Sequence, residues 1–503
     1  MNRQRFLPLA MGLITLVRFL LLALRELSPV ESHAANCASA PGWWLPLTGP
    51  VLPLWMKAST FCFGMNEFGV RFFAPLLMLG AGWLVWKISL SLFDATTAAW
   101  AAVLFQITPA VNLAAIHFTN TTLAIAGSAA MLAVLRLALH RTHRHHLHWW
   151  AVSGVCALMF FTDWRLGLAM GVSSAASLTL TRRGRSALMK WPVLPVLGVC
   201  FLLGITIFLA WNSEHNWNAF AFFPDKSDHG LMAVIHSAFF GFGLLLLPVF
   251  IWVIIETAVQ RPLSYASAYL YAFAWPLLTL DLIAWHTLDW PQVGFAAWVP
   301  PLVMLTAHLM MQTERLAPRI KVWARTTLML ATAAQSCFIM QTENFRAFGI
   351  YWHLDNETKS LFPPDPMRHM IGWRDSAREI ITALDHEGLR GKPFFLVAKN
   401  WQLAAPLAFY LREITAQPRV QVLPDEKGRT PFATWTRFDH NPGADKSNVI
   451  FITDDSRMNI PPKSLRSRWP AHHAIAIFRI ERNGMPVRTL KVFACSPVAA
   501  ADK

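Results

Sequence analysis

The chain has 503 residues, of which 54% are hydrophobic and only 15% are charged, whereas about 25% of the residues in soluble domains are charged. This composition excludes an ordinary soluble protein. The formal net charge is +15, but much of the excess lies in short loops between apolar segments, such as Arg182, Arg183 and Arg185. Basic loops of this kind are typical of membrane topology, so we expect no nucleic-acid partner.

Apolar segments of bilayer length recur through residues 1–341. An apolar helix of ~20 residues crosses the hydrocarbon core, and only helices or closed barrels cross it with every backbone amide satisfied. The segments predict a polytopic α-helical membrane protein with about eleven transmembrane helices and membrane lipids as partners. The predicted spans are 6–25, 71–93, 96–116, 121–139, 149–162, 165–181, 191–211, 232–257, 264–285, 292–311 and 322–341.

The basic loops also predict the orientation. If the N-terminus is cytoplasmic, the loops after alternate spans carry most of the arginines and lysines, as the positive-inside rule requires. An odd number of spans then places residues 342–503 on the outer face. We therefore expect a bacterial inner (plasma) membrane protein with a 1–341 transmembrane domain and a 342–503 periplasmic α/β domain. The first apolar segment resembles a signal peptide, but more spans follow it, so we expect it to be retained.

The loops on the outer face are long. In the first, residues 26–70, the apolar stretch 50–63 is too short to span and is expected to lie at the interface as an amphipathic helix. In the polar tail, helical periodicity at 368–387 and 403–411 alternates with short strands at 393–398, 420–423 and 449–452. Asn483-Gly484 predicts a hairpin between strands at 474–480 and 489–494.

Polar residues close to membrane depth are the first candidates for a site. Glu31 and His33 directly follow the first span, where a carboxylate could act as a general base or hold a divalent cation against a phosphate. The alternative is that Glu31 only marks the water boundary. A divalent cation is the one possible cofactor, and the sequence does not identify its ligands.

A second group of candidates would bind substrate. Arg71 and Arg165 lie at outer ends of predicted spans, and a guanidinium matches phosphate with bidentate geometry. The alternative is that each arginine snorkels at the interface. Polar residues interleaved with tryptophans complete the group, since an aromatic belt does not explain them: Asn212, His215, His286 and Asp289.

The cysteines and the histidine-rich loop carry weaker signals. Cys37 and Cys495 both fall in the predicted outer compartment and could form a disulfide. The segment 140–148 holds five histidines, but it lies in a predicted cytoplasmic loop without a neighbouring carboxylate or cysteine. We interpret it as another basic loop, with metal binding as the lesser alternative.

Several motifs, in order along the chain, resemble the GT-C glycosyltransferases, and most closely the bacterial branch of protein O-mannosyltransferases and the lipid A aminoarabinose transferase. They cover most of the chain: NEFGVRFFAPLL (66–77), TLTRRGR (179–185), WNSEHNWNAFAF (211–222), LDWPQVGF (288–295), GWRDSAREI (372–380) and FFLVAKNWQLAAPLAFYL (394–411). The resemblance implies a polyprenyl-phosphate sugar donor, inverting transfer on the outer face and an Asp-Glu pair in the first outer loop.

The chain departs from that pattern at its acidic positions. The residues that match the Asp-Glu pair are Val30 and Glu31, and a valine cannot take a proton. Thr48-Gly49-Pro50-Val51 stands where relatives carry a DHPP-like stretch, and Thr119-Asn120-Thr121 stands where they carry TPD. Arg165 lies near the position of a lysine often found in the family.

Two functions follow from these residues. The first is a membrane glycosyltransferase that transfers a sugar from a polyprenyl-phosphate donor to a lipid, glycan or protein acceptor of the cell envelope, with Glu31 as base and Arg71 or Arg165 on the phosphate. The alternative is a catalytically degenerate relative that binds a lipid-linked sugar or a partner enzyme as an assembly or regulatory factor.

Overall fold

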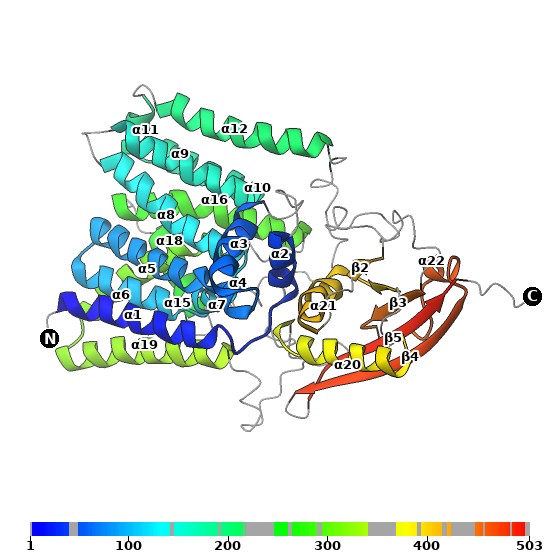
Figure 1. Cartoon of the computed structure of the whole chain (residues 1–503). Helices are drawn as coiled ribbons and strands as arrows, with labels where there is room; N and C mark the ends of the chain where they lie inside the picture. The colour runs from blue at the N-terminus through cyan, green and yellow to red at the C-terminus, as the bar shows by residue number, and fades with distance from the viewer. Residues whose placement is uncertain are drawn as a thin grey trace, which may run out of the picture.

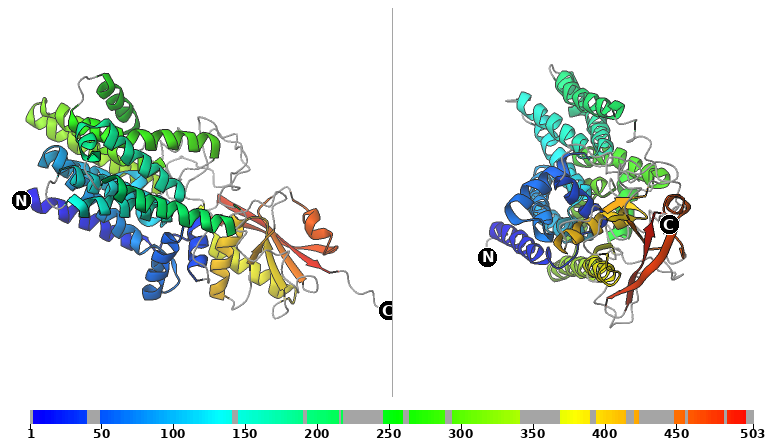
Figure 2. Two further views of the ribbon diagram at one scale, coloured as in Figure 1. Left: turned by 90° about the horizontal axis from the view of Figure 1, so that it is seen from above. Right: turned by 45° about the vertical axis from the view of Figure 1, so that its right-hand side comes forward.

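The computed structural model consists of a helical bundle with a smaller mixed α/β domain at one end (Figure 1). It describes residues 3–39, 49–140, 145–189, 193–214, 217, 246–259, 264–288, 294–340, 369–389, 394–414, 420–423, 448–455, 458–482 and 485–497. Figure 2 shows the long helices running side by side, with the N-terminus at the end of the bundle opposite the C-terminal domain. We call the end that carries this domain the domain end and the other the far end.

Helices lie at or near each predicted span. The first half of the bundle contains α1 (Arg3–Leu21), α2 (Pro29–Ser39), α3 (Val51–Phe63), α4 (Glu67–Arg71), α5 (Phe73–Leu92), α6 (Ala95–Ile107), α7 (Pro109–Ile116), α8 (Asn120–His140), α9 (His145–Thr162), α10 (Trp164–Leu180), α11 (Arg182–Leu188) and α12 (Val193–Glu214). The second half contains α15 (Leu246–Val259), α16 (Tyr265–Leu288), α17 (Gly294–Ala297), α18 (Val299–Glu314) and α19 (Pro318–Met340).

Within the described residues, three helical segments are long and apolar enough to cross a membrane: Glu67–Leu92, Asn120–His140 and Pro195–Glu214. A fourth crossing, predicted as one helix over 96–116, is instead a pair bent by 58° between α6 and α7. The break falls where Thr108 precedes Pro109, because proline lacks an amide donor and disfavours helical geometry in the residue before it. The predicted count of eleven spans stays a prediction.

The C-terminal domain is built on a five-stranded mixed sheet. Its elements are α20 (Trp373–His386), β1 (Phe394–Ala398), α21 (Trp401–Ile414), β2 (Val420–Val422), β3 (Asn448–Thr453), α22 (Lys463–Arg466), β4 (Ala471–Arg482) and β5 (Met485–Ser496), in the sheet order β2-β1-β3-β5-β4. β1 pairs in parallel with β2 and β3, whereas β5 is antiparallel to β3 and β4. The two helices and the strands agree with the periodicities of the tail.

One apolar core joins this domain to the bundle. It contains Leu27 and Leu52 from the loop after α1 and from α3, together with Trp373, Leu407 and Ile450 from the C-terminal domain. The remaining helices enclose a separate core further from the sheet. Because hydrophobic burial is the main stabilising term, the shared core fixes the domain on α2 and α3 rather than leaving it tethered.

The suggested disulfide is not formed. Cys37, in α2, and Cys495, in β5, are both free thiols. Burial raises the pKa of each thiol to about 12. Both therefore remain protonated at neutral pH, where a thiol in this state is a weak nucleophile.

Candidate functional site

Glu31 lies at the domain end of the bundle, in the first turn of α2. The main-chain amide of Ser28 donates to its Oε2 at 3.0 Å, and the amide of Glu31 donates to Oγ of Ser28 at 3.3 Å. This reciprocal pair is a capping box, the S-x-x-E arrangement that begins many helices. The sequence Ser28-Pro29-Val30-Glu31 carries this signal, and it was not used in predicting the role of Glu31.

The carboxylate of Glu31 also forms a buried ion pair with Arg71, the last residue of α4. Nε and Nη2 of Arg71 donate to Oε1 and Oε2 at 2.7 and 2.8 Å. The other guanidinium hydrogens go to the carbonyl oxygens of Leu22, Arg25 and Glu26. Both side chains are almost fully buried. The structure thus brings together the predicted base and the predicted phosphate ligand, but it pairs them with each other.

Two further contacts connect Glu31 to the turn between α7 and α8. The amide of Phe118 donates to Oε1 at 2.9 Å, and Nε2 of His117 lies 3.1 Å from Oε2. The His117 side chain keeps 19% of its surface exposed. It is therefore the member of this cluster that solvent can reach.

These contacts decide the protonation state of Glu31. Burial alone would raise the pKa of its carboxyl, but the charges of Arg71 and His117 outweigh burial and hold that pKa well below its ordinary range. A carboxylate with so low a pKa has little tendency to take a proton. Its strongest chemical effect is to orient the groups that bind it.

A second network holds the C-terminal domain on the bundle. Glu26 accepts hydrogen bonds from the main-chain amides of Trp373 and Arg374, which begin α20. Burial raises the pKa of Glu26, and the two amides only partly offset this. Glu67 accepts from Nη2 of Arg374 at 2.6 Å and from the hydroxyl of Tyr410 at 3.0 Å. The segment between α1 and α5 therefore supplies its acids to the contact between the bundle and the C-terminal domain.

His33 lies in the same interface, two residues after Glu31. Its ring contacts Sγ of Cys37 at 3.8 Å, and its centroid is 6.4 Å from that of Trp401, the first residue of α21. Burial lowers the pKa of His33 to about 3. The imidazole is therefore neutral at physiological pH.

Arg165 pairs with an acid of its own rather than with Glu31. Its Nε and Nη2 atoms lie 2.7 and 2.6 Å from the carboxylate oxygens of Asp163, which also caps α10. Beside this pair, the amide of Gly49 donates to the carbonyl of Thr162 at 2.9 Å. A Cβ atom at Gly49 would lie 1.7 Å from the carbonyl oxygen of Phe161. This close approach explains why a glycine occupies a position where the relatives carry a larger residue.

Asn120 was not among the predicted site residues, although it lies two residues after Phe118. Its side chain is only 3% exposed, and neither Oδ1 nor Nδ2 has a hydrogen-bond partner in the described part of the chain. Buried amides are almost always paired, so this group requires an explanation, and a contact with a ligand is one that fits. The sequence offered one signal, because Asn120 stands inside the segment that replaces TPD.

The remaining predicted residues do not gather here. Asn212 is buried in α12, where Nδ2 donates to the carbonyl of Phe208 at 2.9 Å. His286 lies in α16. His215 and Asp289 lie outside the described residues. Their predicted part in binding stays a prediction.

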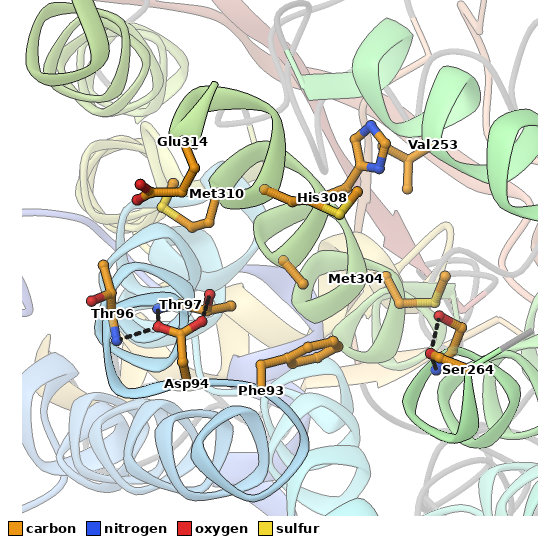
Figure 3. Close-up of a pocket in the computed structure, with 13 residues that line it drawn as sticks. Phe93, Asp94, Thr96, Thr97, Val253, Ser264, Met304, His308, Met310 and Glu314 are labelled. Carbon is orange, nitrogen blue, oxygen red and sulfur yellow. Dashed lines mark hydrogen bonds between the residues drawn. The ribbon is translucent and has the colours of Figure 1, made fainter. Parts of the chain in front are cut away.

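The described residues contain no group of three histidine, cysteine or acidic side chains that could hold a metal ion. They do contain a cavity of about 640 Å³, at the far end (Figure 3). It is lined by residues from the α5–α6 turn, α15, the start of α16 and α18, including Asp94, Ser264, Met304 and His308. α5 extends for about 30 Å between this end and Arg71, so the cavity is separate from the Glu31 cluster.

Comparison with known proteins identifies the fold. Residues 47–211, about a third of the chain, match the family model described as dolichyl-phosphate-mannose-protein mannosyltransferase. The crystal structure of ArnT from Cupriavidus metallidurans in the apo state is similar over 98% of this chain and 98% of ArnT, with a TM-score of 0.65 and 14% sequence identity. The chain has the fold of the GT-C glycosyltransferase ArnT. This agrees with the resemblance seen in the sequence, and the helical segments long enough to cross a membrane agree with a multi-pass membrane protein.

Two other solved structures are similar to this chain. ArnT bound to undecaprenyl phosphate is similar over 97% of this chain and 98% of that one, with a TM-score of 0.63 and 13% identity. An Archaeoglobus fulgidus oligosaccharyltransferase tethered with an acceptor peptide matches 89% of this chain and 69% of its own, with a TM-score of 0.52 and 12% identity. Comparison with curated protein sequences gives no match.

Proposed function

We propose that this GT-C protein transfers a sugar from a polyprenyl-phosphate donor to a cell-envelope acceptor at the membrane face that carries its C-terminal domain. The observation that carries this proposal is the similarity along nearly the whole chain to an ArnT structure that holds undecaprenyl phosphate. The family match supports it, because residues 47–211 run from the first outer loop to α12 and include Asn120 and Asp163. The lipid phosphate would bind between these helices, with Arg71 and Arg165 nearby.

His117 is the group best placed to receive the proton of the acceptor. Its Nε2 lies 2.5 Å from Oγ of Ser28 and 3.1 Å from Oε2 of Glu31. A proton on Nε2, directed at these two oxygens, would leave the lone pair on Nδ1, and the side chain is partly open to solvent. A carboxylate that orients an imidazole in this way is a common arrangement of a general base. As the acceptor oxygen bonds to the anomeric carbon, the bond from that carbon to the phosphate oxygen breaks, the phosphate keeps the electron pair, and His117 takes the proton.

If His117 is the base, the catalytic roles predicted for Glu31 and His33 change. Glu31 would act as a positioning residue, since its carboxylate holds Arg71 and His117. His33, which is neutral and packed near Trp401, would shape the interface with the C-terminal domain. That domain would guide the acceptor.

A second candidate is a relative that binds a lipid-linked sugar or a partner enzyme without catalysis. The observation in its favour is the engagement of Glu31, whose two oxygens accept four hydrogen bonds from Ser28, Arg71 and Phe118. Val30 stands at the position of the family's catalytic acid. Both candidates require binding of a polyprenyl phosphate and differ only in turnover.

The first experiment measures binding of undecaprenyl phosphate to the purified full chain by native mass spectrometry. We expect retention of one lipid, lowered by Asn120→Leu, which fills the position of the unpartnered amide with an apolar group. Thr179→Val, an exposed hydroxyl substitution on α10, is the control. Absence of binding to the wild-type protein contradicts both candidates.

The second experiment separates the two candidates by the cell-envelope glycan profile of a deletion strain complemented with variants. For a general base we expect His117→Gln to lower the glycan product by about 10²-fold or more at unchanged protein abundance. His308→Gln is a matched control, because His308 also pairs with a glutamate, Glu256, at 3.0 Å, but at the far end. If the deletion strain has an unchanged glycan profile while the purified protein binds undecaprenyl phosphate, the results favour the non-catalytic candidate.

A further inference from the structure

A cluster of basic side chains surrounds one aromatic ring at the far end of the bundle. The guanidinium carbons of Arg183, on α11, and Arg136, on α8, lie 4.6 and 5.1 Å from the centroid of the Tyr265 ring. The ring of His140, the last residue of α8, lies roughly parallel to it at 6.5 Å. Nη1 of Arg183 lies 2.7 Å from Nδ1 of His140. Basic groups from α8 and α11 thus meet around a ring supplied by α16.

Arg136 is the buried member of this cluster. Its side chain is 5% exposed, and it is held by Ser91, whose Oγ and carbonyl oxygen accept from Nε and Nη2 at 3.2 and 2.8 Å. Its third nitrogen, Nη1, has no hydrogen-bond partner in the residues described. A guanidinium fixed by two bonds with a third donor unused is prepared for an acceptor that comes from outside.

In the described part of the chain, no acid neutralises these charges. None of the ion pairs between described residues includes Arg136 or Arg183. Asp94, three residues after Ser91, uses its carboxylate to cap α6 through the amides of Thr96 and Thr97. Contact with an aromatic face offsets only about 0.5–2 kcal/mol per cation. Two guanidiniums beside one ring therefore repel each other until an anion binds.

The surroundings indicate where that anion comes from. α8 is a 21-residue apolar segment long enough to span a membrane, and His140 ends it. Leu137, in its last turn, and Leu180, at the end of α10, are 39% and 66% exposed. Exposed leucines followed by exposed basic residues are typical of the depth at which lipid headgroups lie.

We propose that Arg136, Arg183 and His140 form a phosphate-binding site at the far end of the bundle. The ligand is a phosphate group, either in the headgroup of an anionic phospholipid or as free phosphate. Arg136 would donate from Nη1, and Arg183 would turn from His140 to the ligand, since guanidinium binds phosphate oxygens with strong charge-assisted hydrogen bonds. The site lies at the opposite end from Glu31 and does not depend on the proposed transfer reaction.

The experiment uses the purified full chain and two probes, dioleoyl-phosphatidylglycerol and inorganic phosphate. Lipid retention is measured by native mass spectrometry, and binding of free phosphate by the shift in melting temperature. Arg183→Gln is the main variant, because Arg183 is exposed and its loss leaves the core intact. Arg185→Gln is the matched control: it removes the same charge from the same helix, where Nη1 of Arg185 donates to the carbonyl of Thr179.

We expect Arg183→Gln to lower retention of the responding probe by about tenfold, which corresponds to the loss of ~1.4 kcal/mol of binding free energy. Arg185→Gln should retain the probe as the wild-type protein does. A response to the lipid alone identifies a headgroup, and a response to inorganic phosphate alone identifies a soluble ligand. Equal retention by all three proteins, or an equal loss in both variants, overturns the proposal.

Discussion

Two groups of arginines, one at each end of the bundle, differ in their partners. At the domain end Arg71 pairs with Glu31, Arg165 with Asp163 and Arg374 with Glu67. At the far end Arg136 and Arg183 share the ring of Tyr265 without an acidic partner among the described residues. The three ion pairs at the domain end hold elements of the protein together, whereas the cluster around Tyr265 is the one proposed to bind an anion.

The difference shows why an arginine beside a membrane does not by itself identify a ligand site. Arg71 was predicted to bind phosphate, yet all its donors go to Glu31 and to main-chain oxygens. Arg136 attracted no prediction, yet it keeps a donor unused. What distinguishes them is the presence of a fixed acceptor nearby, which only the folded chain reveals.

Breaking the buried pair at the domain end should have the largest effect. Arg71→Gln leaves Glu31 as a buried charge with one cationic neighbour fewer, so we expect a loss of about 3–5 kcal/mol in the free energy of unfolding. Denaturant titration of the purified protein measures it. Arg71→Met with Glu31→Met should recover part of the loss, and a change below about 1 kcal/mol in Arg71→Gln would contradict the assigned pair.

An arginine-to-glutamine substitution at the far end should lower the free energy of unfolding much less. Arg136→Gln loses its bonds to Ser91 but also removes the repulsion from Arg183, so we expect the free energy of unfolding to change by about 1 kcal/mol or less. The same titration in phosphate-free detergent gives the value. Comparable losses in Arg136→Gln and Arg71→Gln would remove the distinction between the ends.

Tyr410→Phe tests how the C-terminal domain is held. The hydroxyl accepts from the amide of Leu27 at 2.7 Å and donates to Glu67 at 3.0 Å. Loss of both bonds should lower the free energy of unfolding by about 1–3 kcal/mol and speed proteolysis of the C-terminal domain. Phe409→Leu, next to it, alters the core without touching these bonds and should leave that cleavage rate closer to the wild-type value.

Acidification should weaken the same interface through His33. Its folded-state pKa is lowered to about 3, while an unfolded histidine titrates near 6.5. Between these values the unfolded chain binds more protons, so stability falls as pH falls. The melting temperature of wild-type protein should drop more from pH 7 to pH 4.5 than that of His33→Gln. His386→Gln, at an exposed position on α20, should behave as wild type.

Asn120→Ala should have the smallest effect on stability. The amide it removes is buried without a partner, so we expect a change of less than about 1 kcal/mol in the free energy of unfolding, or a slight gain. Retention of undecaprenyl phosphate should nevertheless fall. A marked loss of stability would show that Asn120 supports the fold.

Local patterns predicted the elements well. The helical period in the tail predicted α20 and α21, and the turn signal at 483–484 predicted the β4–β5 hairpin. The bend between α6 and α7 was missed because the hydrophobic pattern continues across Pro109. In that segment the proline, rather than the apolar composition, sets the geometry.

The contacts between distant residues could not be predicted in the same way. Glu31 and Arg71 are 40 positions apart, and both were singled out, but no local pattern shows that they meet. The capping box at Ser28 was visible and indicated a structural role for Glu31. Asn120 was visible only as a departure from a family motif, since its missing partners appear only in the folded chain.

The cap that Glu26 provides for α20 also bears on biosynthesis. The first-turn amides of a helix need acceptors that the helix itself lacks, and here one acceptor comes from a residue made some 350 positions earlier. A domain made late in translation thus completes its first helix on a residue of the loop that follows α1. Docking of this domain therefore requires that the loop is already in place.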